Sequence, residues 1–221
     1  GAAYFLTKEH GITNVAVLEK GWLGGGNTGR NTMTVRSNFL REDSVPFHEM
    51  SLDLYHQLSH DLNYNLMVSQ RGMITFIQSS AANRVALQMA NTMHIYGAEY
   101  RMLTLDEVKQ KIPIFDPSPD MRLPVRGGVY QPRASMVRHD AVAWGFARAA
   151  DARGVDIIQN CEVTGIQQNN GAVTGVETTR GLIKAKKIGM AVAGHGSVVA
   201  SMVGQRLPIT TQPLQAWVSE P

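Results

Sequence analysis

The stretch TNVAVLEKGWLGGGN, residues 13–27, decides the fold. It opens with a β-branched run typical of a buried strand, which ends in Glu19 and Lys20 and leads into a glycine-rich loop. The residues before it, 1–10, predict a helix rich in small side chains, with Gly11 as its C-cap. A helix, a glycine, a strand and an acid at the strand's end form the second half of a nucleotide-binding βαβ unit, in which the acid accepts hydrogen bonds from ribose hydroxyls.

In such a unit the acid follows the glycine fingerprint by about 20 residues, and counting back from Glu19 by that spacing passes Gly1. Two interpretations fit. The sequence is a fragment whose first strand and phosphate-binding glycines lie upstream, or it is an α/β protein that begins with a helix and ends this strand in glutamate by chance. Residues 1–20 alone favour neither.

The glycine-rich loop is a second candidate site. Three consecutive glycines are most simply a flexible linker, but here they are followed at once by the compact hydrogen-bonding residues Asn27, Thr28, Arg30, Asn31 and Thr32. Glycine permits close backbone approach, and polar side chains offer donors to a phosphate or a flavin ring. The extended pattern MTVR then ends in Arg36.

The rest of the chain alternates between predicted helices and strands. Helices are expected at 44–60, 80–96, 103–111 and 139–153, and strands within 66–79, at 127–132, near 155–158, at 186–193, and as a hairpin over 161–178 with its turn at Asn170-Gly171. In the first helix, Phe47, Met50, Leu54 and Leu58 share one face, which we expect to be buried. The pattern predicts an α/β nucleotide-binding portion (1–40 and 135–205) interrupted by an α+β insertion (41–134).

The composition excludes several classes of function. The chain has 221 residues, 43% hydrophobic and 18% charged, and its net charge of +3 arises from 21 basic and 18 acidic residues. Because no basic run is interleaved with aromatics, nucleic acid is not an expected partner.

Cys161 is the only cysteine, so neither an intrachain disulfide nor a cysteine-based zinc site is expected, and we predict no metal. Without a signal-like or membrane-spanning apolar run, the expected location is cytoplasmic, with no membrane contact.

Three separated blocks identify a family. They are TNVAVLEKGWLGGGNTGRNTMTVRSNFL, VRHDAVAWGFARAADARGVDIIQNCEVTGI and VTGVETTRG. In order and spacing they resemble the beta subunits of heterotetrameric sarcosine oxidases, which are flavin-dependent amine oxidases of the D-amino-acid-oxidase type. The resemblance covers essentially the whole chain, whereas the family's subunits are longer at the C-terminus. It implies an FAD-binding Rossmann-like domain of the glutathione-reductase type (1–40 and 135–205), truncated at its first strand, with an inserted α+β part of the substrate domain (41–134 and 206–221).

The resemblance also implies roles for individual residues. Glu19 corresponds to the acid that binds the ribose of FAD, Asn27, Thr32 and Thr34 lie on the segment that contacts FAD, and the backbone of Val163 corresponds to the group that reads the adenine edge. Thr34 stands where a bulkier apolar residue is expected, so a backbone contact is the better expectation there. Arg36 corresponds to an arginine that pairs with the substrate carboxylate, which suits its bidentate fork; an exposed structural arginine is the competing interpretation.

His139 has two interpretations. Taken alone, a histidine at a helix start is most simply a cap or a surface residue. The resemblance implies instead that it carries FMN covalently, through the 8α carbon of the flavin. A helix N-terminus favours the neutral, nucleophilic imidazole, and Arg138 could attract the flavin phosphate. Val142, Phe146 and Ala149 are expected to bury the helix and hold the imidazole in place.

The implied activity is oxidative demethylation of sarcosine to glycine, with peroxide formation and one-carbon transfer. FAD and covalent FMN would belong to this chain, NAD and tetrahydrofolate to the partner subunit, and the partners would be alpha, gamma and delta subunits. Two alternatives stay open: another flavin amine oxidase or dehydrogenase acting on dimethylglycine, glycine or a D-amino acid, and a non-catalytic assembly or nucleotide-binding fragment. We expect the 221 residues to be inactive on their own.

Overall fold

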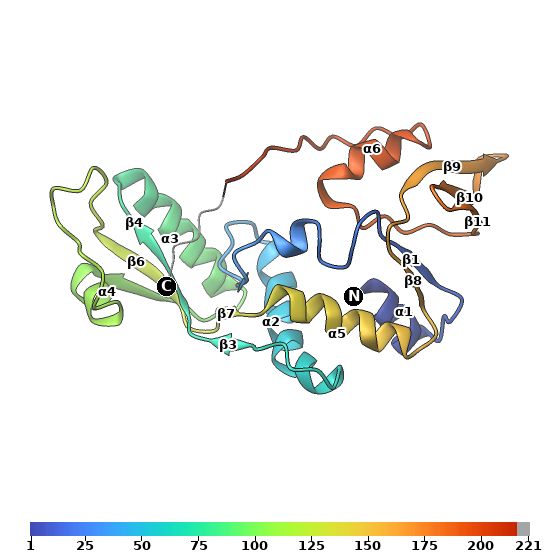
Figure 1. The fold of residues 1–221 in the computed structure, drawn as a ribbon. Helices are drawn as coiled ribbons and strands as arrows, with labels where there is room; N and C mark the ends of the chain where they lie inside the picture. Colours follow the sequence, from blue (N-terminus) through green and yellow to red (C-terminus); the bar gives the residue numbers. More distant parts are fainter. Residues whose placement is uncertain (216–221) are drawn as a thin grey trace. The chain divides into compact units, whose positions relative to one another are not determined.

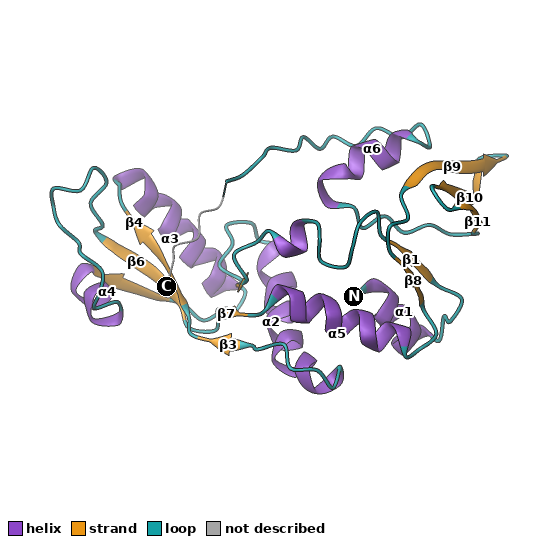
Figure 2. Cartoon of the chain, viewed as in Figure 1, coloured by secondary structure: helices purple, strands orange, loops and turns teal. Residues whose placement is uncertain are grey.

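The computed structural model describes residues 1–215 (Figures 1 and 2). They form two compact units: a first unit of residues 1–32 with the described part of 142–221, and a second unit, Met33–Ala141. The division into 1–40 with 135–205 and 41–134 with 206–221 stays a prediction, and residues 216–221 of its last segment lie outside the described residues.

The first unit is of the mixed α/β type. Its elements are α1 (Ala2–His10), β1 (Ala16–Leu18), η1 (Asn27–Gly29), the larger part of α5 (His139–Asp151), β8 (Asp156–Ile158), β9 (Val163–Asn169), β10 (Ala172–Thr178), β11 (Gly181–Lys184), η2 (Ala193–His195) and α6 (Gly196–Ser201). Strands β1 and β8 are parallel, with Val17 opposite Ile157. Strands β9, β10 and β11 form an antiparallel sheet with β10 in the centre.

Local signals in the sequence place several of these elements. Helix α1 ends at Gly11, which is left-handed (φ 62°) as a glycine C-cap requires. The β9–β10 hairpin turns at Asn170 and Gly171, whose φ angles of 50° and 77° suit the primed turns that join twisted strands. Helices α1 and α5 pack through the rings of Tyr4 and Phe146, whose centroids lie 5.6 Å apart.

The second unit contains two antiparallel sheets and three helices of its own. Its elements are β2 (Thr34–Val35), α2 (Ser44–Asp61), β3 (Ser69–Gln70), β4 (Met73–Ile77), α3 (Ser80–Ile95), β5 (Arg101–Thr104), α4 (Leu105–Lys111), β6 (Gly127–Gln131), β7 (Ser135–Met136) and the first turn of α5. One sheet has the order β4-β6-β5 and the other β2-β7-β3. At Gly128 of β6 a Cβ would lie 2.6 Å from Cγ2 of Ile74, so glycine leaves room for this side chain of the neighbouring strand β4.

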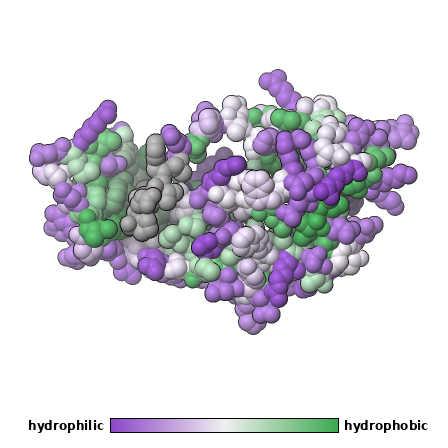
Figure 3. Space-filling model, viewed as in Figure 1, coloured by the Kyte–Doolittle hydropathy of each residue, from purple (hydrophilic) through white to green (hydrophobic). Residues whose placement is uncertain are grey.

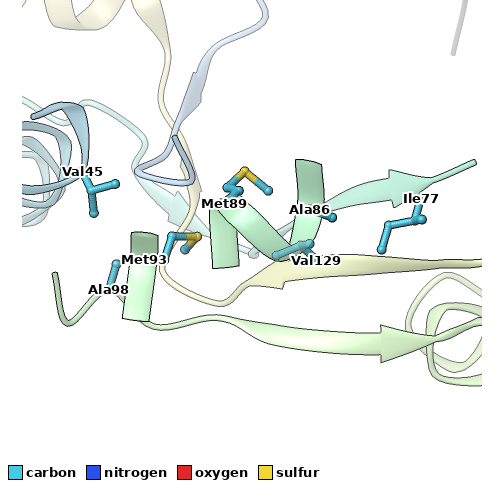
Figure 4. Close-up of a cluster of buried hydrophobic side chains, with 7 residues drawn as sticks. All are labelled: Val45, Ile77, Ala86, Met89, Met93, Ala98 and Val129. Atoms are coloured by element: carbon cyan, nitrogen blue, oxygen red, sulfur yellow. The ribbon is translucent and has the colours of Figure 1, made fainter. Parts of the chain in front are cut away.

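A cluster of buried apolar side chains forms the core of this unit (Figure 4). Its members are Val45, Ile77, Ala86, Met89, Met93, Ala98 and Val129, and Phe39, Ala82 and Tyr100 pack against it. Met89 and Met93 come from α3 and Val129 from the central strand β6. The cluster therefore joins α3 to the β4-β6-β5 sheet and to the start of α2.

Besides the burial of β1, described below, two sequence expectations are wrong. Residues 186–193 form no strand, and among the described residues the parallel sheet holds only β1 and β8, so this segment has no ladder to join. On α2, Leu58 is buried as expected, but Phe47, Met50 and Leu54 are exposed, and the helix buries Val45 and Leu52 in their place. Periodicity identified the helix, but apolar residues lie on more than one side of α2, and only tertiary packing decides which of them are buried.

Large apolar side chains also reach the surface in each unit (Figure 3), among them Val198 in the first and Ile114 in the second. Of the helices described, none has the length and apolar content needed to span a membrane. Strand β1 is half-buried rather than fully buried, with Ala16 exposed.

Candidate functional site

In the first unit, the carboxyl ends of β1 and β8 are bonded together around Glu19. The Cys161 backbone N–H donates to Glu19 O (2.9 Å), and the Asn160 N–H donates to Gly21 O (2.8 Å). The Glu19 side chain is half-buried, and its Oε1 accepts from the Gly21 N–H at 2.9 Å. Nucleotides bind at the carboxyl ends of parallel strands. Glu19 therefore lies where a ribose-binding acid belongs.

Val163 begins β9 close to this corner. The preceding residue, Glu162, forms an ion pair with Lys20 at 2.7 Å, so the segment that enters β9 lies beside the end of β1. Strand β9 is at the edge of its sheet, and among residues 1–215 it pairs only with β10. An edge strand leaves alternate backbone groups outside the ladder, which is the property that adenine recognition by a backbone requires.

The glycine-rich loop is folded into hydrogen-bonded turns, which argues against a flexible linker. The Gly25 N–H donates to Trp22 O (2.9 Å), and the Leu23 N–H donates to Gln159 Oε1 (2.8 Å). At Gly29 a Cβ would lie 2.5 Å from Gly24 O, so only glycine fits there. Of the predicted FAD contacts on this segment, Asn27 begins η1, and Asn27 and Thr32 are both exposed.

In the second unit, the small sheet β2-β7-β3 brings the other three predicted site residues together. Thr34 of β2 pairs with Met136 of β7, and Arg36 follows β2 directly. His139 lies three residues beyond Met136, at the start of α5. Thr34 is exposed, and Arg36 and His139 are half-buried. The paired strands β2 and β7 thus lead into the residues expected to contact flavin and substrate: Arg36 directly follows β2, and His139 begins α5 three residues after β7 ends.

The segment that leads to His139 is fixed on both sides. The Val137 N–H donates to Met33 O (3.0 Å), and the Arg138 N–H donates to Leu66 O (3.1 Å). His139 Nδ1 is buried, and no described residue forms a hydrogen bond with it. A buried polar atom without a partner costs free energy and calls for an explanation. An attached group at this imidazole would supply one, so the residue fits a flavin-bearing histidine.

The charges beside His139 are paired with each other. Arg138 donates to Asp140 through both Nε (3.1 Å) and Nη2 (2.7 Å). These bonds, together with one from the Ala141 backbone N–H, lower the pKa of Asp140 from 3.8 to about 2. The Arg138 guanidinium is therefore already paired with the Asp140 carboxylate. To bind a flavin phosphate, Arg138 would have to break these hydrogen bonds to Asp140.

Arg36 is held by neutral groups. Its Nη1 donates to Asn38 O (3.1 Å) and Asn38 Oδ1 (2.8 Å), and its guanidinium lies 4.5 Å from the ring centroid of Phe39. Among the described residues it forms no ion pair, whereas Arg133 in the same unit binds both Glu49 and Asp53. Arg36 thus keeps an uncompensated positive charge of the kind a carboxylate ligand requires.

A buried polar network next to Arg36 was not found from the sequence. Gln131 Oε1 accepts from the Ser37 N–H (3.1 Å), the Gln131 amide donates to the Ser37 hydroxyl, and that hydroxyl donates to Glu49, which Arg133 also binds. Ser37 and Gln131 are fully buried. The partners come from the segment after β2, from α2, and from β6 and the turn that follows it. Because these segments are far apart in the sequence, no local pattern predicts the network.

A family model described as "FAD dependent oxidoreductase" matches residues 1–221. The chain belongs to this family. The family description names FAD, a dinucleotide, and in dinucleotide-binding folds the ribose-binding acid follows a parallel strand, as Glu19 follows β1.

Curated relatives match almost the whole chain. It is 51% identical over 218 residues to "Sarcosine oxidase subunit beta" of Rhizobium meliloti (strain 1021) and 50% identical over 218 residues to the protein of the same name from Arthrobacter sp. These alignments cover 99% of this chain but 52% and 54% of the relatives. The chain therefore spans about half the length of the curated relatives it matches.

Solved structures agree on the fold. L-proline dehydrogenase from P.horikoshii superimposes with a TM-score of 0.80 at 22% identity, covering 91% of this chain and 52% of that one. At this identity the match shows a shared fold alone and carries no information about substrate.

Proposed function

We propose that this chain is the flavin-carrying part of a sarcosine oxidase beta subunit, which oxidatively demethylates sarcosine to glycine with peroxide formation and one-carbon transfer. The observation that carries the proposal is the identity of 50–51% to two proteins named sarcosine oxidase subunit beta over 99% of the chain. The name of those relatives also supports a complex with partner subunits, which we propose to be alpha, gamma and delta in the cytoplasm, with NAD and tetrahydrofolate on a partner.

Both units would contribute residues that contact FAD. Glu19 would bind the FAD ribose, the backbone of Val163 the adenine edge, and the segment containing Asn27, Thr32 and Thr34 the rest of FAD. When bound, the flavin accepts a hydride equivalent from the amine's carbon, and the protein contributes binding, orientation and electrostatics.

Arg36 would bind the carboxylate of the amine substrate. Its positive charge is held by the neutral Asn38 and stacked on Phe39, and a bidentate arginine–carboxylate pair fixes both the position and the orientation of a small amino acid. This contact would also serve dimethylglycine, glycine or a D-amino acid, so the substrate must be identified by assay.

His139 would carry FMN covalently. The buried Nδ1 without a partner supports an attached group, and the hydrogen bonds of Val137 and Arg138 hold the segment from which the imidazole projects. A fixed, buried imidazole is suited to act as a nucleophile toward one position of a flavin.

Two experiments test the proposal on the protein assembled with its partner subunits. Acid precipitation releases FAD but should leave yellow flavin in the pellet, and His139→Ala should abolish that colour while His60→Ala, at a histidine whose side chain is 97% exposed, keeps it. A colourless pellet from the unmodified protein would exclude covalent FMN. Peroxide should form with sarcosine faster than with dimethylglycine or glycine, and no peroxide with sarcosine would exclude the proposed substrate.

A further inference from the structure

We propose that Asn38 is a positioning residue that reserves the Nε–Nη2 edge of Arg36 for the substrate carboxylate. The proposal rests on the role proposed above for Arg36. Nη1 donates to two acceptors of one residue, Asn38 O (3.1 Å) and Asn38 Oδ1 (2.8 Å), which uses both of its N–H groups. Arginine has five donors, and a carboxylate binds bidentately to two adjacent ones. The remaining bidentate edge is Nε with Nη2, and no described residue accepts a hydrogen bond from it.

Asn38 is itself held in one orientation. Its side chain is 3% exposed, and its Nδ2 donates to Thr75 Oγ1 of β4 at 3.0 Å. Because the amide nitrogen is bound to the hydroxyl, the amide oxygen faces the guanidinium. The preceding residue, Ser37, is anchored through its N–H to Gln131 Oε1, so the backbone between β2 and Asn38 is fixed as well.

The face of the guanidinium is fixed by a second contact. Arg36 lies over Phe39 at 4.5 Å from the ring centroid, and Phe39 packs on the core cluster of the second unit. The Phe39 ring also contacts His48, whose ring centroid is 4.0 Å away and whose Nδ1 donates to Ser44 O at 2.7 Å. One edge and one face of the guanidinium are therefore occupied before any substrate binds, which reduces the ordering that binding requires.

The neutrality of Asn38 matters as much as its position. An aspartate at this site would place a negative charge against Nη1, and it would compete with the substrate carboxylate for the same cation. Asn38→Asp should therefore weaken substrate binding more than Asn38→Ala, although aspartate keeps the size of the side chain and its acceptor oxygen.

The test is steady-state kinetics of the assembled protein with sarcosine. Asn38→Ala should raise KM roughly tenfold and Asn38→Asp by more, in keeping with the loss of a hydrogen bond to a charged group, while kcat changes little. Thr75→Ala, which frees the amide without removing it, should raise KM by a few fold and serves as a second variant if Asn38→Ala folds poorly. Asn91→Ala, at an exposed asparagine of α3, should leave KM unchanged.

A double-mutant cycle separates positioning from a purely structural role. In an Arg36→Ala background, Asn38→Ala should have no further effect on KM, and the affinity for acetate, read from the absorbance of the bound flavin, should weaken in parallel with KM in the single variants. Additive effects, or an Asn38→Ala protein with unchanged KM beside an impaired Arg36→Ala protein, would overturn the positioning role alone. An unchanged KM in Arg36→Ala would overturn the proposed carboxylate contact itself.

Discussion

Glu19 Oε1 accepts a hydrogen bond of 2.9 Å from the backbone N–H of Gly21, two residues further along the chain. The turn that leaves β1 thus binds the acid that ends it, and the carboxylate is oriented by its own loop. Because Gly21 O in turn accepts from the Asn160 N–H, the orientation of the acid is tied to the end of the neighbouring parallel strand.

Glu19→Ala should weaken FAD binding roughly 10- to 100-fold, because hydrogen bonds from ribose hydroxyls to a carboxylate are lost. Fluorescence titration of the FAD-depleted protein with FAD measures the change. Glu162→Ala is the matched control: its carboxylate lies at the same corner but pairs with Lys20, whose side chain is 71% exposed, so FAD affinity should stay within about twofold. Unchanged FAD affinity in Glu19→Ala would contradict the ribose assignment.

The sequence predicted those parts of the fold that depend on neighbouring residues. The left-handed Gly11 C-cap and the Asn170-Gly171 turn are each set within a few residues, and both are in the structure. Glu19 was placed at the end of a parallel strand for the same reason, because the order of helix, glycine and strand is local.

What depends on distant partners was not predicted. The burial of Val45 on α2 depends on the core cluster, which gathers residues from α2, α3, β4 and β6. The bonds of Ser37 to Gln131 and of Glu49 to Arg133 join residues 94 and 84 positions apart. The buried Nδ1 of His139 also emerges only from packing, since the sequence shows a histidine at a helix start and nothing of its surroundings.

Glu49→Ala should destabilise the fold by about 2–3 kcal/mol, because it leaves the buried Ser37 hydroxyl and the Arg133 guanidinium without their shared acceptor. Asp53→Ala removes the other carboxylate on the same arginine. The Asp53 side chain is 66% exposed and that of Glu49 only 15%, so the second substitution should cost about 0–1 kcal/mol. Urea unfolding of both variants measures the difference, and equal losses would show that burial does not set the strength of these pairs.

Thr104→Ala should lower the free energy of unfolding by about 1 kcal/mol, the usual cost of losing an N-cap side chain. Thr104 Oγ1 accepts from the Glu107 N–H (3.3 Å), and Glu107 Oε2 accepts from the Thr104 N–H (2.7 Å). Because the two hydrogen bonds belong to one capping box, Glu107→Ala should lower the free energy of unfolding by a similar amount. The double variant should lose less than the sum of the two single losses. Strict additivity in denaturant unfolding would show that the two residues act independently at the start of α4.

The ion pair beside His139 should make stability depend on pH in the acid range. Arg138 and the Ala141 N–H lower the pKa of Asp140 to about 2, below the 3.8 of an unperturbed aspartate. The unfolded chain therefore binds a proton on Asp140 more readily than the folded chain does. The stabilising contribution is fully present above about pH 4 and is lost as the pH falls from about 4 to about 2.

Asp140→Asn should accordingly lower the urea midpoint near neutral pH, and its difference from the unmodified protein should shrink toward zero as the pH approaches about 2. Arg138→Met should reproduce this loss, because without the guanidinium the pKa of Asp140 returns toward its usual value. Urea titrations over a pH series measure all three proteins. A difference between Asp140→Asn and the unmodified protein that persists unchanged at pH 2 would show that the carboxylate stabilises the start of α5 by some means other than its charge.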